Sequence, residues 1–173
     1  ANGYIGTRGT FEEEYDFDVE TGLEGNFVNG FYESEHIRYG EWNFGFPTES
    51  QSLLNLPNAK IIKLFIEDEE FSMLTGEIED YKRVLHMKEG RITRNLIWVS
   101  PKGKKVKISI SRFVSFNNKN LMEIRYKVTP LNFSGNLKFI SAIDANVENH
   151  TRKTNPLVDY GPFGKRLAND YID

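Results

Sequence analysis

Cysteine is absent from the 173 residues of this chain, which excludes disulfides and thiolate metal sites. A chain without cysteine suits a reducing compartment, and we predict a cytoplasmic location. No apolar stretch approaches the length of a membrane span, and no secretion signal precedes Asn2, so we expect no membrane association. The chain begins with Ala1 instead of Met, and we expect it to be part of a longer polypeptide.

An excess of positive charge is also lacking. The net charge is −3, so a general attraction to nucleic acid is not expected. The nearest approach to a basic stripe is Lys102, Lys104, Lys105 and Lys107. These lysines flank a predicted turn and alternate with apolar residues, which indicates a solvated strand face.

Helical periodicity is missing as well. No run of ten residues has it, and residues 77–85 predict one helical turn at most. The chain instead alternates apolar and polar residues over 106–110, 122–128 and 137–147, a pattern typical of half-buried strands. We therefore predict three consecutive antiparallel strands.

Other strands are expected elsewhere. Residues 92–99 predict a fourth strand, 60–66 a buried strand, and 27–32 and 37–42 two less regular ones. The segment after His150 contains two prolines and two glycines and is predicted to be a loop. The expected fold is all-β, an antiparallel β-sandwich or barrel that forms a single domain over 1–173.

Three glycines in the first nine residues raise the question of a phosphate-binding loop. Such a loop needs a preceding strand, a following helix and usually a lysine, and here the basic residue is Arg8. We interpret the segment as a tight turn that glycine permits. Arg8 is retained as a candidate because a fixed guanidinium can clamp an anion or an acidic partner.

Acidic residues are dense over 12–20. Paired carboxylates are used by glycosidases and calcium sites. Here Glu12 and Glu14 share one parity with the later acidic residues, while aromatic residues occupy the other. We therefore predict a solvated acidic face over an apolar underside.

No pattern for a metal site or a nucleophilic triad is found. His36, His86 and His150 are far apart in the sequence, and no serine lies in a nucleophile elbow. No metal ligand is predicted.

Aromatic residues are plentiful, at 13% of the chain. Tyr39, Trp42 and Phe46 lie in a polar and aromatic stretch and could stack on a sugar ring. Residue type alone favours the alternative that they are packing residues, because most large rings are buried.

The same stretches, in their order along the chain, resemble glycoside hydrolase family 65. The resemblance rests on Asn2-Gly3-Tyr4-Ile5-Gly6-Thr7-Arg8-Gly9, Asn29-Gly30-Phe31-Tyr32-Glu33, Leu54-Asn55-Leu56-Pro57-Asn58, Trp98-Val99-Ser100-Pro101-Lys102-Gly103-Lys104, Arg112-Phe113-Val114-Ser115, Ile124-Arg125-Tyr126 and Thr129-Pro130-Leu131-Asn132-Phe133-Ser134-Gly135. These motifs span roughly residues 2 to 147.

The resemblance implies a super-sandwich related to galactose mutarotase, here incomplete, followed in the parent protein by an (α/α)6 barrel. The barrel would hold the catalytic Glu, and inorganic phosphate would attack the anomeric carbon of a disaccharide such as maltose with inversion. No catalytic residue and no cofactor is therefore expected in this chain, and phosphate is the expected co-substrate of the parent. Candidates for contact with the substrate or the barrel are Arg8, Tyr32, Glu33, Tyr39, Glu41, Trp42 and Phe46.

The expected partners are the barrel of the same parent chain, the disaccharide and a second copy in a homodimer. Missing strands would leave an open sheet edge, and such edges favour pairing with another chain. Two other functions stay open from the residues alone: a freestanding carbohydrate-binding module, and a domain that holds an assembly together.

Overall fold

The computed structural model describes residues 1–14, 24–149 and 158–159. Every regular element in this part of the chain is a β-strand, and all the strand pairs are antiparallel. Within it, no helix is long and apolar enough to cross a membrane. The prediction of an all-β antiparallel fold is confirmed.

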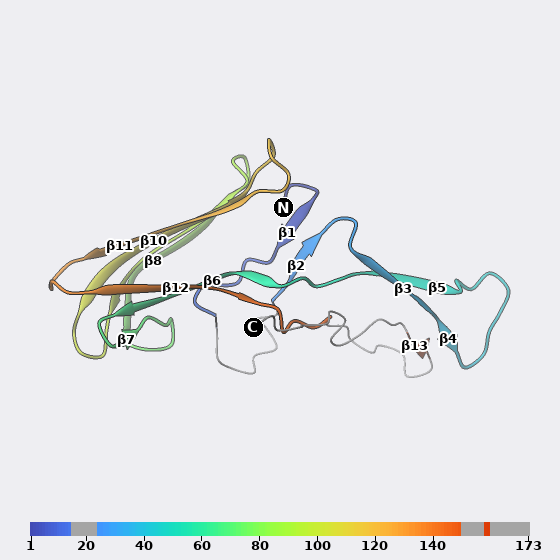
Figure 1. Ribbon diagram of the computed structural model, residues 1–173, viewed down its shortest axis with the longest axis horizontal. Coiled ribbons are helices and arrows are strands. Elements are labelled where there is room, and N and C mark those ends of the chain that lie inside the picture. Colours follow the sequence, from blue (N-terminus) through green and yellow to red (C-terminus); the bar gives the residue numbers. More distant parts are fainter. Residues whose placement is uncertain (15–23, 150–157, 160–173) are drawn as a thin grey trace, which may run out of the picture.

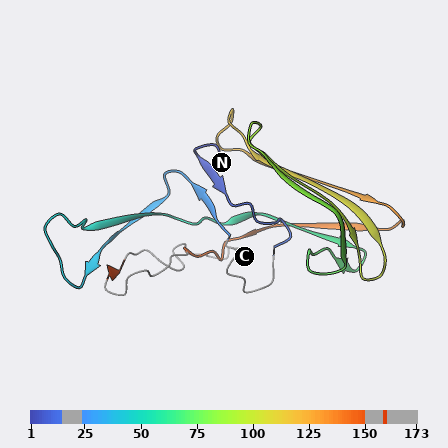
Figure 2. The ribbon, with the colours of Figure 1, turned by 180° about the vertical axis from the view of Figure 1, so that it is seen from behind.

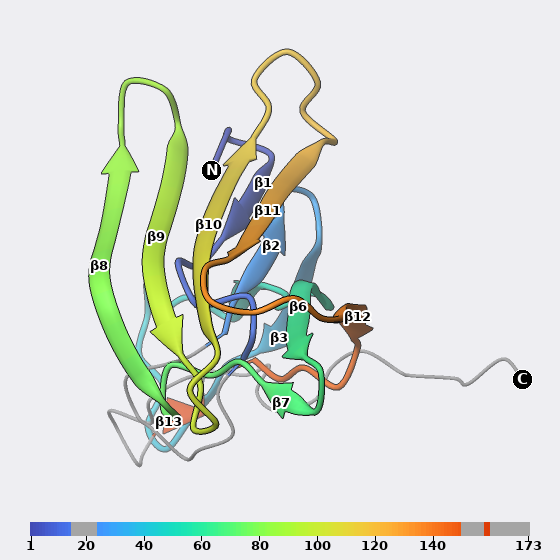
Figure 3. The ribbon, with the colours of Figure 1, turned by 90° about the vertical axis from the view of Figure 1, so that its left-hand side faces the viewer.

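The larger sheet has four strands in the order β11-β10-β9-β8 (Figure 3). They are β8 (Glu77–His86), β9 (Arg91–Val99), β10 (Lys105–Val114) and β11 (Met122–Pro130). The alternation in β10 translates directly into burial, because Val106, Ile108 and Ile110 are buried while Lys107 is exposed. The strands predicted at 92–99, 106–110 and 122–128 are therefore confirmed.

The second sheet has the order β12-β6-β7, formed by β6 (Asn58–Ile66), β7 (Glu69–Glu70) and β12 (Leu137–Asp144). It confirms the buried strand at 60–66. The third of the consecutive antiparallel strands, predicted at 137–147, forms as β12, but it pairs with β6 and not with β11. The chain thus crosses between sheets after β11, a step that periodicity within a strand does not encode.

The core lies between these two sheets, which are inclined to each other (Figure 1). Its fully buried members are Leu64, Ile66, Phe71, Leu96, Trp98, Val106, Ile108 and Ile110. Trp98 donates a hydrogen bond from Nε1 to the Thr75 carbonyl oxygen at 2.6 Å. Its ring packs edge-on against the Phe71 ring, with 5.5 Å between the ring centroids. Apolar faces of two sheets packed in this way make the chain a β-sandwich.

Residues 77–85, for which the sequence allowed one helical turn at most, form no helix and belong to edge strand β8. A β-bulge between Glu79 and Lys82 shifts the register of β8 against β9, and Asp80 has a φ of 49°. A bulge inserts an extra residue, so the alternation changes phase in the middle of the strand and is hidden from a period-two search.

A buried carboxylate connects the two sheets at one end. Glu69 of β7 accepts hydrogen bonds from Ser100 Oγ at 2.8 Å and from the Lys102 backbone N–H at 2.9 Å, and pairs with Lys104 Nζ at 3.3 Å. Burial raises the pKa of the Glu69 carboxyl, but these contacts more than offset that effect, so its pKa is lowered overall. The Glu69 carboxyl group is therefore charged when it binds the β9–β10 turn.

The remaining strands form three short pairs. They are β1 (Ile5–Thr7) with β2 (Asn26–Val28), β3 (Tyr32–His36) with β5 (Glu49–Leu53), and β4 (Arg38–Tyr39) with β13 (Val158–Asp159). The strand predicted at 27–32 is interrupted by a turn at Asn29 and Gly30, where Gly30 has a φ of +101°. Of the strand predicted at 37–42, only Arg38–Tyr39 forms. The loop predicted after His150 lies outside the described residues, except for β13.

Candidate functional site

A long hairpin projects from the sandwich, and it carries most of the predicted contact residues. β3 and β5 run antiparallel, with Tyr32 opposite Leu53 and His36 opposite Glu49. Figure 2 shows this hairpin extending away from the two main sheets. We call residues 31–53 the arm.

Large aromatic side chains on the arm are exposed. Trp42 is 61% exposed, Phe44 93% and Phe46 43%. The Tyr39 and Phe46 rings pack at 5.2 Å, and Tyr39 OH donates to the Pro47 carbonyl oxygen at 2.8 Å. These two rings are thus held in place by local contacts. Tyr39 is half-buried, as a packing residue would be, whereas Trp42 and Phe46 are exposed.

The structure brings six of the seven sequence candidates onto the arm. Tyr32 is half exposed, and its OH donates to Asn29 Oδ1 at 2.5 Å. Glu33 lies opposite Ser52 in the β3–β5 register and is partly buried, and Glu41 is exposed near Trp42 in the sequence.

The seventh candidate, Arg8, lies apart from the arm. It directly follows β1, where its backbone N–H donates to the Gly25 carbonyl oxygen at 2.8 Å. Its own carbonyl oxygen accepts a hydrogen bond from Arg112 Nη2 at 3.0 Å, and its side chain is exposed. Arg8 therefore belongs with the body of the sandwich.

A buried ionic cluster lies on the core-facing side of the four-stranded sheet, and it was not predicted from the sequence. Arg94 donates to Glu13 through Nη1 at 2.6 Å and Nη2 at 2.5 Å, and its Nη2 also donates to Glu12 at 3.1 Å. Arg112 Nη1 lies 3.1 Å from Glu12 Oε1. Glu12, Glu13, Arg94 and Arg112 are each no more than 5% exposed.

The prediction of a solvated acidic face at 12–20 was therefore wrong for its first residues. Glu12 and Glu13 lie inside the sandwich because Arg94 and Arg112 compensate their charge, and residues 15–20 lie outside the described part. A signal was present in the sequence, since Arg94 and Arg112 occupy positions of β9 and β10 where the alternation demands an apolar side chain.

Burial opposes the charge of both arginines, but the outcome differs between them. For Arg94, burial lowers the pKa, but the hydrogen bonds of Glu13 and the charges of Glu13 and Glu12 raise it by more, so its pKa is above the ordinary value. For Arg112, burial lowers the pKa and the charge of Glu12 offsets this only in part, so its pKa is lowered. Arg94 is thus the better compensated of the two.

A third buried cation lies on the other sheet. Lys60 of β6 is 1% exposed, forms an ion pair with Glu24, and donates to Asn58 Oδ1 at 2.9 Å. Burial lowers the pKa of Lys60, although Glu24 works against that shift. Together, these contacts fasten residues 10–13 and 24–26 between the sheets.

The described residues show no arrangement for metal binding. His36 is exposed, and the His86 ring lies 2.9 Å from Thr93 Oγ1. Over 1–14, 24–149 and 158–159, no group of three or more His, Cys, Asp or Glu side chains is placed to hold a metal ion.

Fold and site together define an antiparallel β-sandwich domain with an exposed aromatic arm. The family model described as "Glycosyl hydrolase family 65, N-terminal domain" matches residues 1–167. The chain therefore belongs to glycosyl hydrolase family 65, as its N-terminal domain, which confirms the resemblance in the motifs.

Relatives and a solved structure agree with this placement. Alpha,alpha-trehalose phosphorylases from Thermoanaerobacter brockii and Geobacillus stearothermophilus are 48% and 38% identical over 86% and 92% of this chain. The chain spans only 19% and 21% of their lengths. A structure assigned as a kojibiose phosphorylase from the human microbiome has a TM-score of 0.59 and 29% identity, over 73% of this chain and 17% of that one.

Proposed function

We propose that this chain is a non-catalytic part of a longer disaccharide phosphorylase. The observation that carries the proposal is the family match over residues 1–167, together with relatives that are about five times longer and carry the name phosphorylase. The parent enzyme would cleave an α-glucoside with inorganic phosphate and invert the anomeric carbon, giving a β-glucose 1-phosphate. Its catalytic acid would lie outside these 173 residues.

We propose α,α-trehalose as the first substrate to test. Identity to trehalose phosphorylases is 48% and 38%, whereas it is 32% to a maltose phosphorylase and 34% to a kojibiose phosphorylase. This ranking is the support for trehalose over the maltose that the motifs alone suggested.

The experiment is an assay of the parent enzyme with trehalose, maltose and kojibiose, each with and without inorganic phosphate. The proposal expects trehalose to have the highest kcat/KM and expects all turnover to require phosphate. A preference for another disaccharide would refute the substrate, and glucose release without phosphate would refute the reaction.

For the arm, we propose that its rings contact the remainder of the parent polypeptide. Trp42, Phe44 and Phe46 expose apolar surface on a two-stranded hairpin, and contiguous exposed apolar surface in a folded protein usually marks an interaction site. Glu41 and Tyr32, both exposed, would lie at the edge of that contact.

Direct binding of sugar by the same rings is the second candidate. The observation in its favour is the fixed Tyr39–Phe46 pair on the same arm as the exposed Trp42, since immobilised rings lose little entropy when a sugar stacks on them.

Titration of the isolated chain with trehalose and maltose separates the two roles of the arm. Millimolar affinity that is lost in Trp42→Ala supports direct sugar binding. No binding to the chain, together with a loss of at least about tenfold in the activity of the parent carrying Trp42→Ala, supports the contact with the remainder of the polypeptide. Met87→Ala is the matched control, since Met87 is 84% exposed on a hairpin turn away from the arm.

We further propose a cytoplasmic homodimer with no cofactor besides the co-substrate phosphate. The absence of cysteine supports the location. The ten-residue strand β8 ends the four-stranded sheet, and no described strand pairs with its outer edge; an edge of this length favours association with another chain. Light scattering over a wide concentration range tests the dimer, and a monomer throughout would refute it.

A further inference from the structure

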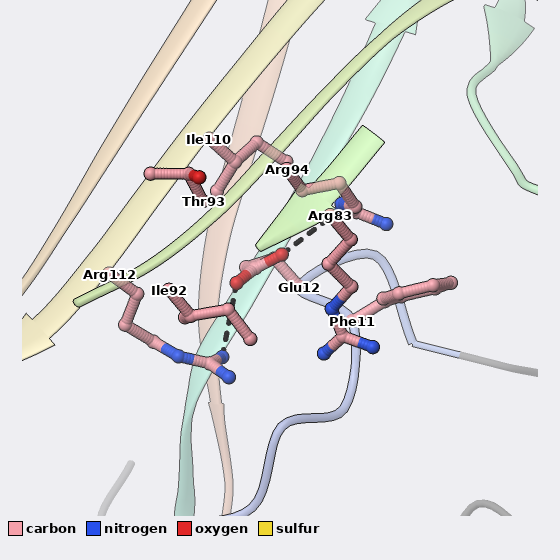
Figure 4. Close-up of a pocket in the computed structure, with 8 residues that line it drawn as sticks. All are labelled: Phe11, Glu12, Arg83, Ile92, Thr93, Arg94, Ile110 and Arg112. Atoms are coloured by element: carbon pink, nitrogen blue, oxygen red, sulfur yellow. Dashed lines mark hydrogen bonds and ion pairs between the residues drawn. The ribbon is translucent and has the colours of Figure 1, made fainter. Parts of the chain in front are cut away.

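A small cavity lies beside the buried ionic cluster, and cationic groups dominate its lining. Three guanidinium groups, from Arg83, Arg94 and Arg112, face it together with the carboxylate of Glu12 (Figure 4). Its volume is about 10 Å³, which is room for a single water-sized particle. Phe11, Ile92 and Ile110 form the apolar part of the wall.

The charges around this cavity do not balance. Glu13 is engaged by Arg94 through two hydrogen bonds, and Glu12 is shared between Arg94 and Arg112. Arg83 adds a third cation, and within the described part of the chain it forms no ion pair; its guanidinium lies 4.9 Å from the centre of the Phe11 ring. Among the described residues at the cavity, one positive charge is therefore left over.

Two donors in the cluster also form no hydrogen bond with the described part of the chain. Arg94 Nε and Arg112 Nη1 are buried and make no hydrogen bond, although Arg112 Nη1 lies within ion-pair distance of Glu12. Both residues are 3% exposed. A buried donor left unsatisfied is costly, so such a group usually has a partner among water, ions or protein atoms.

We propose that this cavity binds one small monovalent anion, of the size of chloride. The anion would accept from the Arg94 and Arg112 donors that make no hydrogen bond, and from the guanidinium of the exposed Arg83, which closes the cavity on the solvent side. It would neutralise the excess charge and strengthen the attachment of residues 10–13 to β9 and β10. Burial is the main cause of the lowered pKa of Arg112, and the charges of Arg83 and Arg94 add to that effect.

The experiment compares thermal unfolding of the 173-residue chain in sodium chloride and in sodium gluconate at equal ionic strength. Line broadening of chloride-35 NMR gives the dissociation constant. The proposal expects a saturable rise in Tm in chloride alone. It also expects affinity about tenfold weaker in Arg83→Gln, the loss of one charge-assisted hydrogen bond. Arg83 is exposed, so this variant keeps the core intact, and circular dichroism verifies its fold.

Arg125→Gln is the matched control, since Arg125 is 80% exposed on β11 and does not line the cavity. It should bind chloride as the unaltered chain does. Equal Tm in the two salts would overturn the proposal and assign the cavity to water. Equal affinity in the two variants would overturn it as well, because chloride would then be bound elsewhere.

Discussion

The buried ionic cluster makes a quantitative prediction about Arg94. The substitution Arg94→Met keeps the aliphatic stem and removes three charge-assisted hydrogen bonds, two to Glu13 and one to Glu12. Both carboxylates would then remain buried, and only Glu12 would keep an ion pair, with Arg112. Removing one partner of a buried ion pair costs about 3–5 kcal/mol, a large fraction of the roughly 5–15 kcal/mol that stabilises a typical domain.

Urea denaturation measures this loss as a change in the free energy of unfolding. The fluorescence of the buried Trp98 reports the transition cleanly in a Trp42→Phe background, because Trp42 is exposed on the arm. Arg91→Met is the matched control on the same strand. Its pair with Glu89 is exposed, with the Arg91 side chain 40% accessible, and should contribute less than about 1 kcal/mol.

A double-mutant cycle with Glu13→Leu isolates the pair. The double variant should be less destabilised than the sum of the single ones, because no buried charge is left without its partner at that position. Equal losses in Arg94→Met and Arg91→Met would refute the reasoning, since the cluster would then contribute no more than a surface pair.

Three further predictions concern residues that stabilise the sandwich. The pKa of Glu69 is lowered from its ordinary value of 4.5, so its contribution is complete above that value and is lost as the pH falls below it. The urea midpoints of the unaltered chain and of Glu69→Gln should accordingly differ at pH 7 and converge in acid, and a constant difference would contradict this assignment. Gly76→Ala should destabilise by at least about 1 kcal/mol, because Gly76 has a φ of +70° and an added Cβ would lie 2.8 Å from Trp98 Nε1 and collide with the Val99 carbonyl oxygen. An unchanged Tm would show that the turn relaxes. Trp98→Ala should cost about 3–5 kcal/mol in urea denaturation, and a loss below about 1 kcal/mol would contradict its central place in the core.

The sequence was sufficient to predict most of the larger sheet. In β9, β10 and β11 one face packs on the core, so apolar and polar residues alternate with a period of two. This alternation is visible in the sequence of each strand alone. The same reading failed at β8 because of the bulge at Asp80. It also failed for the partner of β12, because alternation specifies a face and not a neighbour.

The candidate site was predictable to a different degree. Six of the seven candidates lie in stretches between residues 29 and 47, so their common place on the arm follows from a single hairpin. The ionic cluster could not be predicted from short stretches of sequence, because Glu13 pairs with Arg94, which is 81 residues away in the chain. An arginine at an apolar position of a strand was the only local sign of it.

The most direct test of the central proposal compares this chain with the parent enzyme for the phosphorolysis of α,α-trehalose, followed by phosphorus-31 NMR. The account predicts β-glucose 1-phosphate from the parent, only when inorganic phosphate is present, and no product from the 173-residue chain. Turnover by the isolated chain, or an α-anomer from the parent, would contradict it.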